Sequence, residues 1–234
     1  MASTRLPGKV LADIGGMPML SLIARRLRLA QRIDDIVLAT STSPADDALV
    51  LWAGSEGVAV HRGSEDDVLA RVVGAQRMMK GDIVVEVCGD TPLIDPGLID
   101  RAIDRFLAGG CDVVTNTVRP SYPQGSEAQV FAFSALDEVE RTVADAAVRE
   151  HVSLHFYENP RYRIAHLEAP EEQRLPEQRL QVDYPEDLEL VRTIHARLSP
   201  VHGISYGLAQ IVGLLRREPQ LAEMNSHCVE KAAR

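Results

Sequence analysis

The sequence has few cysteines and few aromatic residues. Its 234 residues include three cysteines, and aromatic residues make up 4% of the total. Three cysteines cannot all pair with one another, and Cys88, Cys111 and Cys228 do not have the spacing of a metal site. This usage is typical of a reduced, cytoplasmic protein.

The sequence also lacks an excess of positive charge and any long apolar run. Aspartate and glutamate number 34 against 25 lysines and arginines, and the resulting net charge of −9 argues against broad nucleic-acid binding. A local cluster such as Arg5 and Lys9 can still bind a small anionic ligand. No run approaches the roughly 18 apolar residues of a membrane span, and no apolar segment typical of a signal peptide follows Lys9. We therefore expect neither a nucleic acid nor a membrane as a partner.

Short β-branched runs alternate with longer amphipathic stretches in the first half of the chain. The runs at 36–40, 83–88 and 112–115 contain nearly continuous apolar residues, which is typical of strands buried on both faces of a sheet. Between them, apolar residues recur at helical spacing, for example at Leu20, Ile23, Ala24, Leu27 and Ala30. Strand–helix–strand repetition of this kind predicts a doubly wound α/β sheet.

The pattern changes near residue 120. The segment 119–125 is rich in proline and glycine, which is typical of a loop, and two further strands are predicted between residues 129 and 167. From Pro185 onward the chain has helical periodicity. We therefore expect a mixed, mostly parallel sheet in one domain, 1–234, with an excursion around 119–165 and a helical C-terminal segment, 185–234.

The segment 3–9, Ser-Thr-Arg-Leu-Pro-Gly-Lys, has the residue types of a phosphate-binding loop. Gly8 lets backbone N–H groups approach a ligand closely, while Arg5 and Lys9 match phosphate with a guanidinium and an ammonium group. Short basic segments of this kind also occur as ordinary N-terminal tails before a first helix. The segment by itself does not separate these two interpretations.

Two acidic residues are candidates for a metal site. Asp90 follows the predicted strand at 83–88, and ligands of open α/β sheets bind beyond the carboxyl ends of the strands. A carboxylate there suits Mg²⁺, which is usually held by one or two carboxylates together with phosphate oxygens. The alternative is that Asp90 caps the next turn. Asp183 follows another short extended segment and is the second candidate ligand.

Other polar residues are candidates for the nucleotide and substrate pockets. Arg62 and Gly63 precede a predicted helix start and could line a nucleotide pocket. Arg149 and His151 form a polar cluster suited to a substrate or interface role. A lone histidine is more often structural than catalytic, so His151 is not assigned to a metal site. The sequence contains no conventional P-loop, Gly-x-Ser-x-Gly elbow or His-Glu-x-x-His pair.

Taken together, these segments resemble the acidic-sugar cytidylyltransferases, or CMP-sugar synthetases, and are most similar to the SpsF type of spore-coat polysaccharide biosynthesis proteins. The similar segments follow the family's order and cover nearly the whole chain: 3–9, 14–19, 62–69, 89–94, 149–152 and 182–187. The resemblance implies a Rossmann-like, GT-A-like nucleotidyltransferase fold. It also implies an enzyme that activates an acidic or related sugar with CTP and releases pyrophosphate, for the biosynthesis of surface polysaccharides.

The resemblance assigns roles to individual residues. It implies nucleotide binding by Ser3, Thr4, Arg5, Gly8, Lys9, Arg62 and Gly63, catalysis by Arg5, Lys9 and Asp90, and Mg²⁺ binding by Asp90 and Asp183. It further implies sugar binding by Gln129, Arg149 and His151. A homodimer is expected, with the region 122–130 reaching toward the partner chain.

The sequence departs from the family's pattern in two places. The family normally opens with an apolar strand ending in Gln-Ala-Arg, and that strand and its arginine are absent here, so we expect the fold without its usual first strand. Gln124 and Gln129 are amides in a segment where the family has acidic residues, which bears on sugar specificity. Two alternatives stay open: a glycosyltransferase, although no Asp-x-Asp triplet is present, and a catalytically silent, dimeric nucleotide-binding protein.

Overall fold

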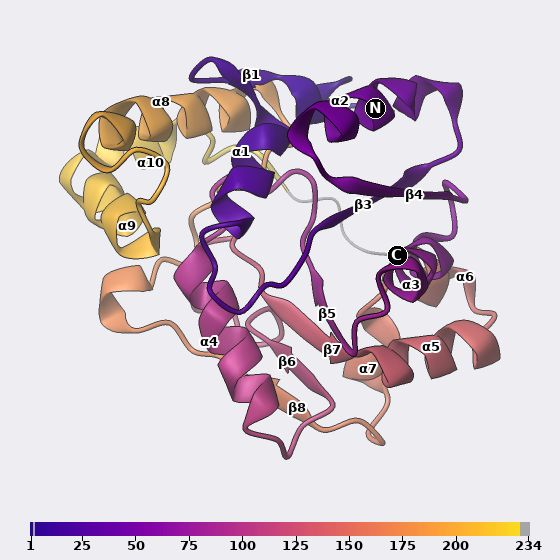
Figure 1. Ribbon diagram of the computed structural model, residues 1–234. Coiled ribbons are helices and arrows are strands. Elements are labelled where there is room, and N and C mark those ends of the chain that lie inside the picture. Colours follow the sequence, from indigo (N-terminus) through magenta and orange to yellow (C-terminus); the bar gives the residue numbers. More distant parts are fainter. Residues whose placement is uncertain (2, 230–234) are drawn as a thin grey trace.

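Two separate pieces of β-sheet lie at the centre of the protein, in a computed structural model that describes residue 1 and residues 3–229 (Figure 1). The smaller piece pairs β3 (Val37–Ser41) in parallel with β4 (Ala59–Gly63). The larger piece has the strand order β5-β7-β6-β8 and consists of β5 (Ile83–Glu86), β6 (Val113–Thr115), β7 (Gln129–Ala132) and β8 (Ile164–His166). A short hairpin of β1 (Asp13–Ile14) and β2 (Met17–Pro18) is paired with neither piece.

The larger piece is a mixed sheet with an apolar core on each face. β7 pairs antiparallel with both β5 and β6, whereas β6 and β8 are parallel. Successive side chains of a strand point to opposite faces, so Val113 belongs to one core and its neighbour Val114 to the other.

Helices cover both faces of this sheet (Figure 1). On one face, α1 (Met19–Leu27) and α4 (Pro96–Leu107) pack into the core that contains Val114. On the other face, a group of helices packs around Phe131: α3 (Val68–Met79), α5 (Phe133–Thr142), α6 (Ala146–Glu150) and α7 (Leu154–Glu158). A further helix, α2 (Asp47–Glu56), lies against β4.

The C-terminal region is helical and is attached to the rest of the fold through a buried arginine. It contains α8 (Pro185–His202), α9 (Leu208–Arg217) and α10 (Pro219–Glu223), while residues 230–234 of the predicted helical segment lie outside the described residues. Arg26 of α1 is fully buried. Its guanidinium donates hydrogen bonds to the carbonyl oxygens of Leu93, Ile94, Ile204 and Tyr206. The side chain therefore joins α1 to both the chain before α4 and the chain before α9.

The predicted strands are present and the pairing is mixed, but the strands form two separate pieces rather than one mostly parallel sheet. The runs at 36–40, 83–88 and 112–115 contain β3, β5 and β6. β3 and β5 are not hydrogen-bonded to each other, and in the described part of the chain no strand lies between them. The expected mixed sheet is therefore present as two separate pieces. A cleft of about 790 Å³ separates the two strand edges.

The segment 119–165, predicted as an excursion, supplies part of the central fold. Its β7 lies between β5 and β6, and its helices α5 and α6 pack against α3. Tyr122, Ala128 and Val130 are buried within the chain, so a second copy would have to contact other residues of the segment. The homodimer stays a prediction.

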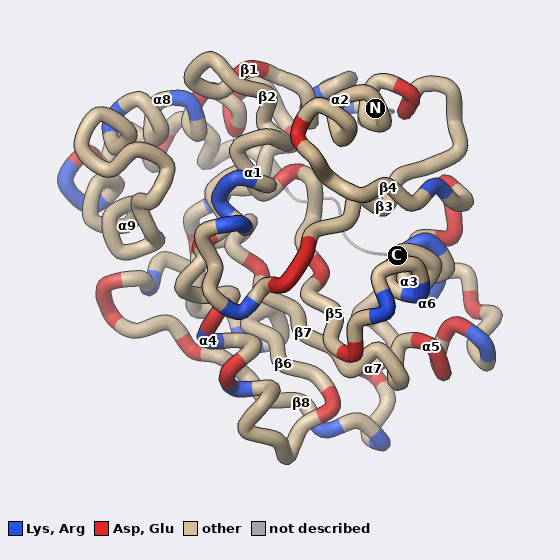
Figure 2. The backbone as a smooth tube through the Cα atoms, in the orientation of Figure 1, with Lys and Arg blue, Asp and Glu red and all other residues tan. Residues whose placement is uncertain are grey.

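Charged residues of both signs occur along the chain, and the helices are short or polar. Figure 2 shows acidic and basic residues interspersed along the backbone, with no broad basic face in that view. Within residues 3–229, no helix combines the length and the apolar character needed to cross a bilayer.

Candidate functional site

The N-terminal loop, residues 3–9, is a turn closed by its own polar groups. The N–H of Leu6 donates to Ser3 Oγ at 3.3 Å, and the N–H of Lys9 donates to the carbonyl of Leu6 at 3.2 Å. Gly8 has a φ of 71°, in the left-handed region that glycine adopts without steric cost. The side chain of Thr4 is exposed. The turn ends at Lys9, which begins a short 3₁₀ helix, η1 (Lys9–Leu11).

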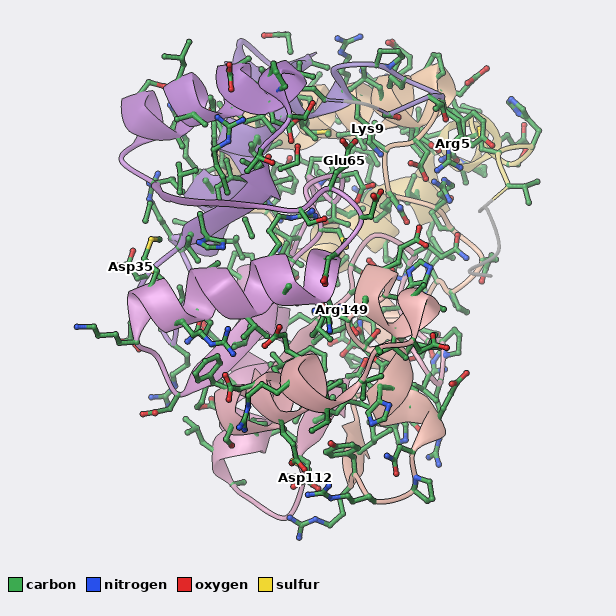
Figure 3. All side chains as sticks on the ribbon, turned by 90° about the vertical axis from the view of Figure 1, so that its right-hand side faces the viewer. Arg5, Lys9, Asp35, Glu65, Asp112 and Arg149 are labelled. Atoms are coloured by element: carbon green, nitrogen blue, oxygen red, sulfur yellow. The ribbon has the colours of Figure 1, made fainter. Side chains whose placement is uncertain are left out.

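Lys9 joins the two acidic residues that the sequence predicted as metal ligands. Its Nζ donates to Asp90 Oδ2, to Asp183 Oδ1 and to the carbonyl oxygen of Val182, each at 2.8 Å. Arg5 forms an ion pair with the same Asp183 oxygen, also at 2.8 Å. Figure 3 shows Arg5 and Lys9 near each other at one end of the molecule. The structure therefore brings these two cations together with Asp90 and Asp183, which we call the acidic pair.

The two segments that carry the acidic pair are hydrogen-bonded to each other. Asp90 follows the carboxyl end of β5, where ligands of open α/β sheets bind. The N–H of Val182 donates to the carbonyl oxygen of Asp90 at 2.9 Å. Asp183 is positioned in turn by Asp187, whose Oδ2 accepts a hydrogen bond from the Asp183 N–H at 2.9 Å. Asp187 therefore has a structural role at the start of α8.

A close backbone approach at Gly125 fixes the segment before Asp183. The N–H of Leu180 donates to the carbonyl of Gln124 at 2.7 Å. The next residue, Gly125, has a φ of 86°, and a Cβ atom there would collide with the backbone of Gln181. Only glycine satisfies both conditions without distortion.

The charges of the site favour the ionised form of Asp183. Burial raises the pKa of Asp183, but the hydrogen bond and charge of Lys9 and the charge of Arg5 outweigh burial and lower it below its ordinary value. Asp90 keeps a buried oxygen, Oδ1, without a hydrogen-bond partner. Because both carboxylates accept a bond from one nitrogen at 2.8 Å, their bonded oxygens lie within twice that distance of each other. An unpartnered carboxylate oxygen beside a second carboxylate is a donor set that fits Mg²⁺.

The acidic pair lies beside the cleft between β3 and β5. Lys9, Gly89 and Asp90 line one part of this cleft, and most of the remaining wall is apolar and comes from α1, α3, β3 and β5. Its volume of about 790 Å³ falls in the range of roughly 300–1,000 Å³ that is common for small-molecule sites. The polar end of the cleft therefore adjoins a space large enough for a ligand of nucleotide size.

Arg62 and Gly63, predicted to line the nucleotide pocket, lie at the end of β4 and contact a different part of the protein. Arg62 donates to the carbonyl oxygens of Ser41 and Ser43, both at 2.9 Å, and pairs with Asp47 at 2.7 Å. These contacts hold β4 against the end of β3 and the start of α2. A nucleotide role for Arg62 and Gly63 stays a prediction.

Arg149 and His151, predicted to bind the sugar, are not brought next to Lys9 by any hydrogen bond in the described residues. Arg149 forms an ion pair with Asp67 at 2.7 Å and donates to the carbonyl oxygens of Glu140 and Val143. Its bonds thus join α6 to the start of α3 and the end of α5, and Figure 3 places it well away from Arg5. His151 directly follows α6 and is half-buried. Their sugar-binding role stays a prediction.

Three residues at the site were missed by the sequence analysis. Arg179 is buried and forms an ion pair with Asp183, and Gln181 donates to Asp90 Oδ2 at 3.3 Å. Glu86, the last residue of β5, also lines the cleft. Each lies within four positions of Asp90 or Asp183 in the sequence, and this proximity was the only feature that could have identified them. Their contacts depend on how distant segments pack.

Residues 1–212 match the sequence profile of the family described as Cytidylyltransferase. The chain belongs to this family. The MJ1063 protein of Methanocaldococcus jannaschii is 33% identical over 233 residues, which cover 99% of this chain and 93% of MJ1063. The spore coat polysaccharide biosynthesis protein SpsF of Bacillus subtilis is 33% identical over 228 residues, covering 95% of this chain and 93% of SpsF. A 3-deoxy-manno-octulosonate cytidylyltransferase of Sinorhizobium medicae is 39% identical over 121 residues, which cover 50% of this chain and 48% of that enzyme.

Solved structures show the same fold. A cytidylyltransferase of Leptospira borgpetersenii superposes with a TM-score of 0.88 at 26% identity and covers 99% of this chain and 95% of its own. CMP:2-keto-3-deoxy-manno-octonic acid synthetase, complexed with CTP, has a TM-score of 0.61 at 18% identity, covering 84% and 95%. Rv0371c of Mycobacterium tuberculosis, complexed with manganese, has a TM-score of 0.57 at 17% identity, covering 82% and 94%. This cytidylyltransferase therefore has the α/β nucleotidyltransferase fold, with sheets that are small and separated.

Proposed function

We propose that this cytidylyltransferase transfers the cytidylyl group of CTP to a hydroxyl of an acidic or related sugar and releases pyrophosphate. The observation that carries the proposal is the placement of Arg5 and Lys9 against the acidic pair beyond the carboxyl end of β5. The site thus offers cations for a triphosphate and carboxylates for a divalent metal within a few ångströms. CTP in the structure of the related synthetase and manganese in Rv0371c support this choice of ligands.

The residues of the site have distinct roles in the proposed reaction. A sugar hydroxyl attacks the α-phosphorus in line, and the bond between this phosphorus and the departing pyrophosphate breaks. Arg5 and Lys9 bind phosphate oxygens and neutralise the charge that the leaving group carries away. The fixed loop holds the triphosphate in one orientation, which reduces the entropy cost of reaching the transition state. Mg²⁺ held by Asp90 and Asp183 supplies further charge neutralisation on the phosphates.

Lys9 takes part in an exchange of partners in this proposal. Without ligand, its ammonium group satisfies both members of the acidic pair. With Mg²⁺ held by the acidic pair, Lys9 would be free to bind the phosphate oxygens of CTP. The protein therefore keeps the carboxylates compensated in both states, which avoids the cost of a buried, unpaired charge.

Pyrophosphate release tests the proposal. The protein is incubated with each of the four common nucleoside triphosphates, Mg²⁺ and a panel of acidic, neutral and amino sugars. We expect release that requires CTP, a sugar and Mg²⁺, and that falls by at least about 100-fold in Asp90→Asn. Asp112→Asn is the matched control, because Asp112 lies at the opposite end of the molecule from Lys9 (Figure 3) and pairs there with Arg163.

The outcomes separate the proposal from its alternatives. Pyrophosphate release that does not depend on Asp90 would contradict the assigned site. Stabilisation by CTP without release with any sugar would instead indicate nucleotide binding without transfer. In a parallel incubation with a nucleotide sugar, cleavage of that sugar without pyrophosphate release would indicate a glycosyltransferase.

A further inference from the structure

Four polar side chains form a row across the edge of the larger sheet. The strand register pairs Glu86 with Gln129, Gln129 with Thr115, and Thr115 with His166. Side chains of residues paired across a sheet lie on the same face. We call these four residues the polar row. The rest of this face is apolar and belongs to the core around Phe131. Apolar packing therefore does not explain why four polar side chains lie together at its edge.

The polar row lies where a ligand of this fold would bind. Glu86, Thr115 and His166 are the last residues of β5, β6 and β8, and Gln129 is the first residue of the antiparallel β7. The row is therefore at the carboxyl edge of the sheet, the edge beyond which ligands bind in open α/β folds. Glu86 also lines the same cleft as Lys9 and Asp90, so the row adjoins the proposed nucleotide site.

The middle of the row is held rigidly by Tyr157 of α7. The tyrosine hydroxyl donates to Gln129 Oε1 at 2.6 Å and lies 2.9 Å from Thr115 Oγ1. Thr117 completes the network through its own hydroxyl, 3.1 Å from that of Tyr157. Because Gln129 Oε1 faces the tyrosine, its amide nitrogen is directed to the other side. These bonds fix side-chain orientations before any ligand arrives.

The two ends of the row carry buried polar atoms without partners. Glu86 Oε2 and His166 Nδ1 are both buried and make no hydrogen bond. A buried polar atom without a partner costs roughly 1–3 kcal/mol, so native proteins seldom keep one without a function. In the part of the chain that the structure describes, no lysine or arginine forms a hydrogen bond or ion pair with a side chain of the row. Glu86 therefore has a free acceptor and no cation beside it.

We propose that the polar row binds the sugar, and that Glu86 selects sugars that present hydroxyl or amino hydrogen-bond donors over sugars that present a carboxylate. A hydroxyl or ammonium group satisfies the free oxygen of Glu86. A sugar carboxylate beside Glu86 meets a second carboxylate, and no arginine or lysine of the described residues pairs with Glu86. At the other end of the row, burial and the charge of Arg119 lower the pKa of His166. The inference rests on the proposed function and narrows its sugar class toward neutral and amino sugars.

Steady-state kinetics of Glu86→Gln test this assignment. Wild type and variant are assayed with CTP, Mg²⁺ and three sugar classes: neutral hexoses, amino sugars and 3-deoxy-2-keto acids. We expect wild-type turnover with a neutral or amino sugar, and a loss of about 10- to 100-fold in kcat/KM for that sugar in Glu86→Gln, which corresponds to one hydrogen bond to a charged group. Binding of CTP, measured by calorimetry, should change less than about twofold. The control is Glu172→Gln, because Glu172 is exposed and lies in the short 3₁₀ helix η3 (Glu171–Gln173), which packs against α9.

A second variant keeps the proposal testable if Glu86→Gln folds poorly. Tyr157→Phe removes the hydroxyl that orients Gln129, and it should raise KM for the sugar with little change in CTP binding. Two results together overturn the assignment of Glu86 while leaving the proposed function intact: turnover is fastest with a 3-deoxy-2-keto acid, and Glu86→Gln does not reduce it. Absence of pyrophosphate release with every sugar overturns both.

Discussion

Replacing Glu86 with glutamine should make the folded protein more stable, and increasingly so as the pH rises. Burial raises the pKa of Glu86 from 4.5 to about 7. A carboxyl group whose pKa is higher in the folded state binds its proton preferentially in that state. The stability that it contributes is complete below about pH 4.5 and is lost as the pH rises through about 7. Glutamine does not titrate, so the variant does not share this loss.

The expected size of the effect follows from the two pKa values. Their difference of about 2.5 pH units corresponds to about 3 kcal/mol of unfolding free energy. Glu86 lines the cleft and is half-buried as a residue, although its Oε2 atom is buried. Water in the cleft screens the ionised form, so we expect about 2 kcal/mol.

Urea unfolding of wild type and Glu86→Gln across the pH range measures this difference. The stability advantage of the variant should grow by about 2 kcal/mol between about pH 5 and about pH 8. Burial raises the pKa of the neighbouring Tyr157 hydroxyl, so it stays neutral over this range and does not contribute. Glu172→Gln should show no such trend. A difference between Glu86→Gln and wild type that is independent of pH would refute the reasoning.

Three further substitutions test other contacts of the fold and the site. Lys9→Met leaves Asp90 without a cationic partner, while Arg5 and Arg179 still pair with Asp183. It should therefore destabilise the metal-free protein by about 3 kcal/mol, and Mg²⁺ should restore stability in a thermal-shift assay more than it stabilises wild type. Arg26→Met leaves carbonyl oxygens unsatisfied and should cost about 3 kcal/mol or more in urea unfolding, whereas Arg25→Met, on the exposed face of the same helix, should cost less than about 1 kcal/mol. Gly125→Ala forces a Cβ against the backbone of Gln181 and should cost at least about 2 kcal/mol; a loss below about 0.5 kcal/mol would contradict the close approach.

Much of the fold could be predicted from local pattern. The β-branched runs predicted β3, β5 and β6, because strand formation depends on the composition and periodicity of a few consecutive residues. Asp95 accepts a hydrogen bond from the N–H of Leu98 at the start of α4, as the Asp-Pro pair indicates. The division of the sheet into pieces was not predicted from this pattern, because strand pairing depends on which strands become neighbours in space.

The sequence by itself determined the residue types of the candidate site and their order along the chain. Arg5, Lys9, Asp90 and Asp183 were predicted because a basic loop and a carboxylate after an extended segment have recognisable chemistry. Only the tertiary structure decided that Lys9 Nζ lies 2.8 Å from both carboxylates. It also decided that Glu86 stands in a row with Gln129 and faces a free space, because the register between strands distant in the chain places those side chains on one face.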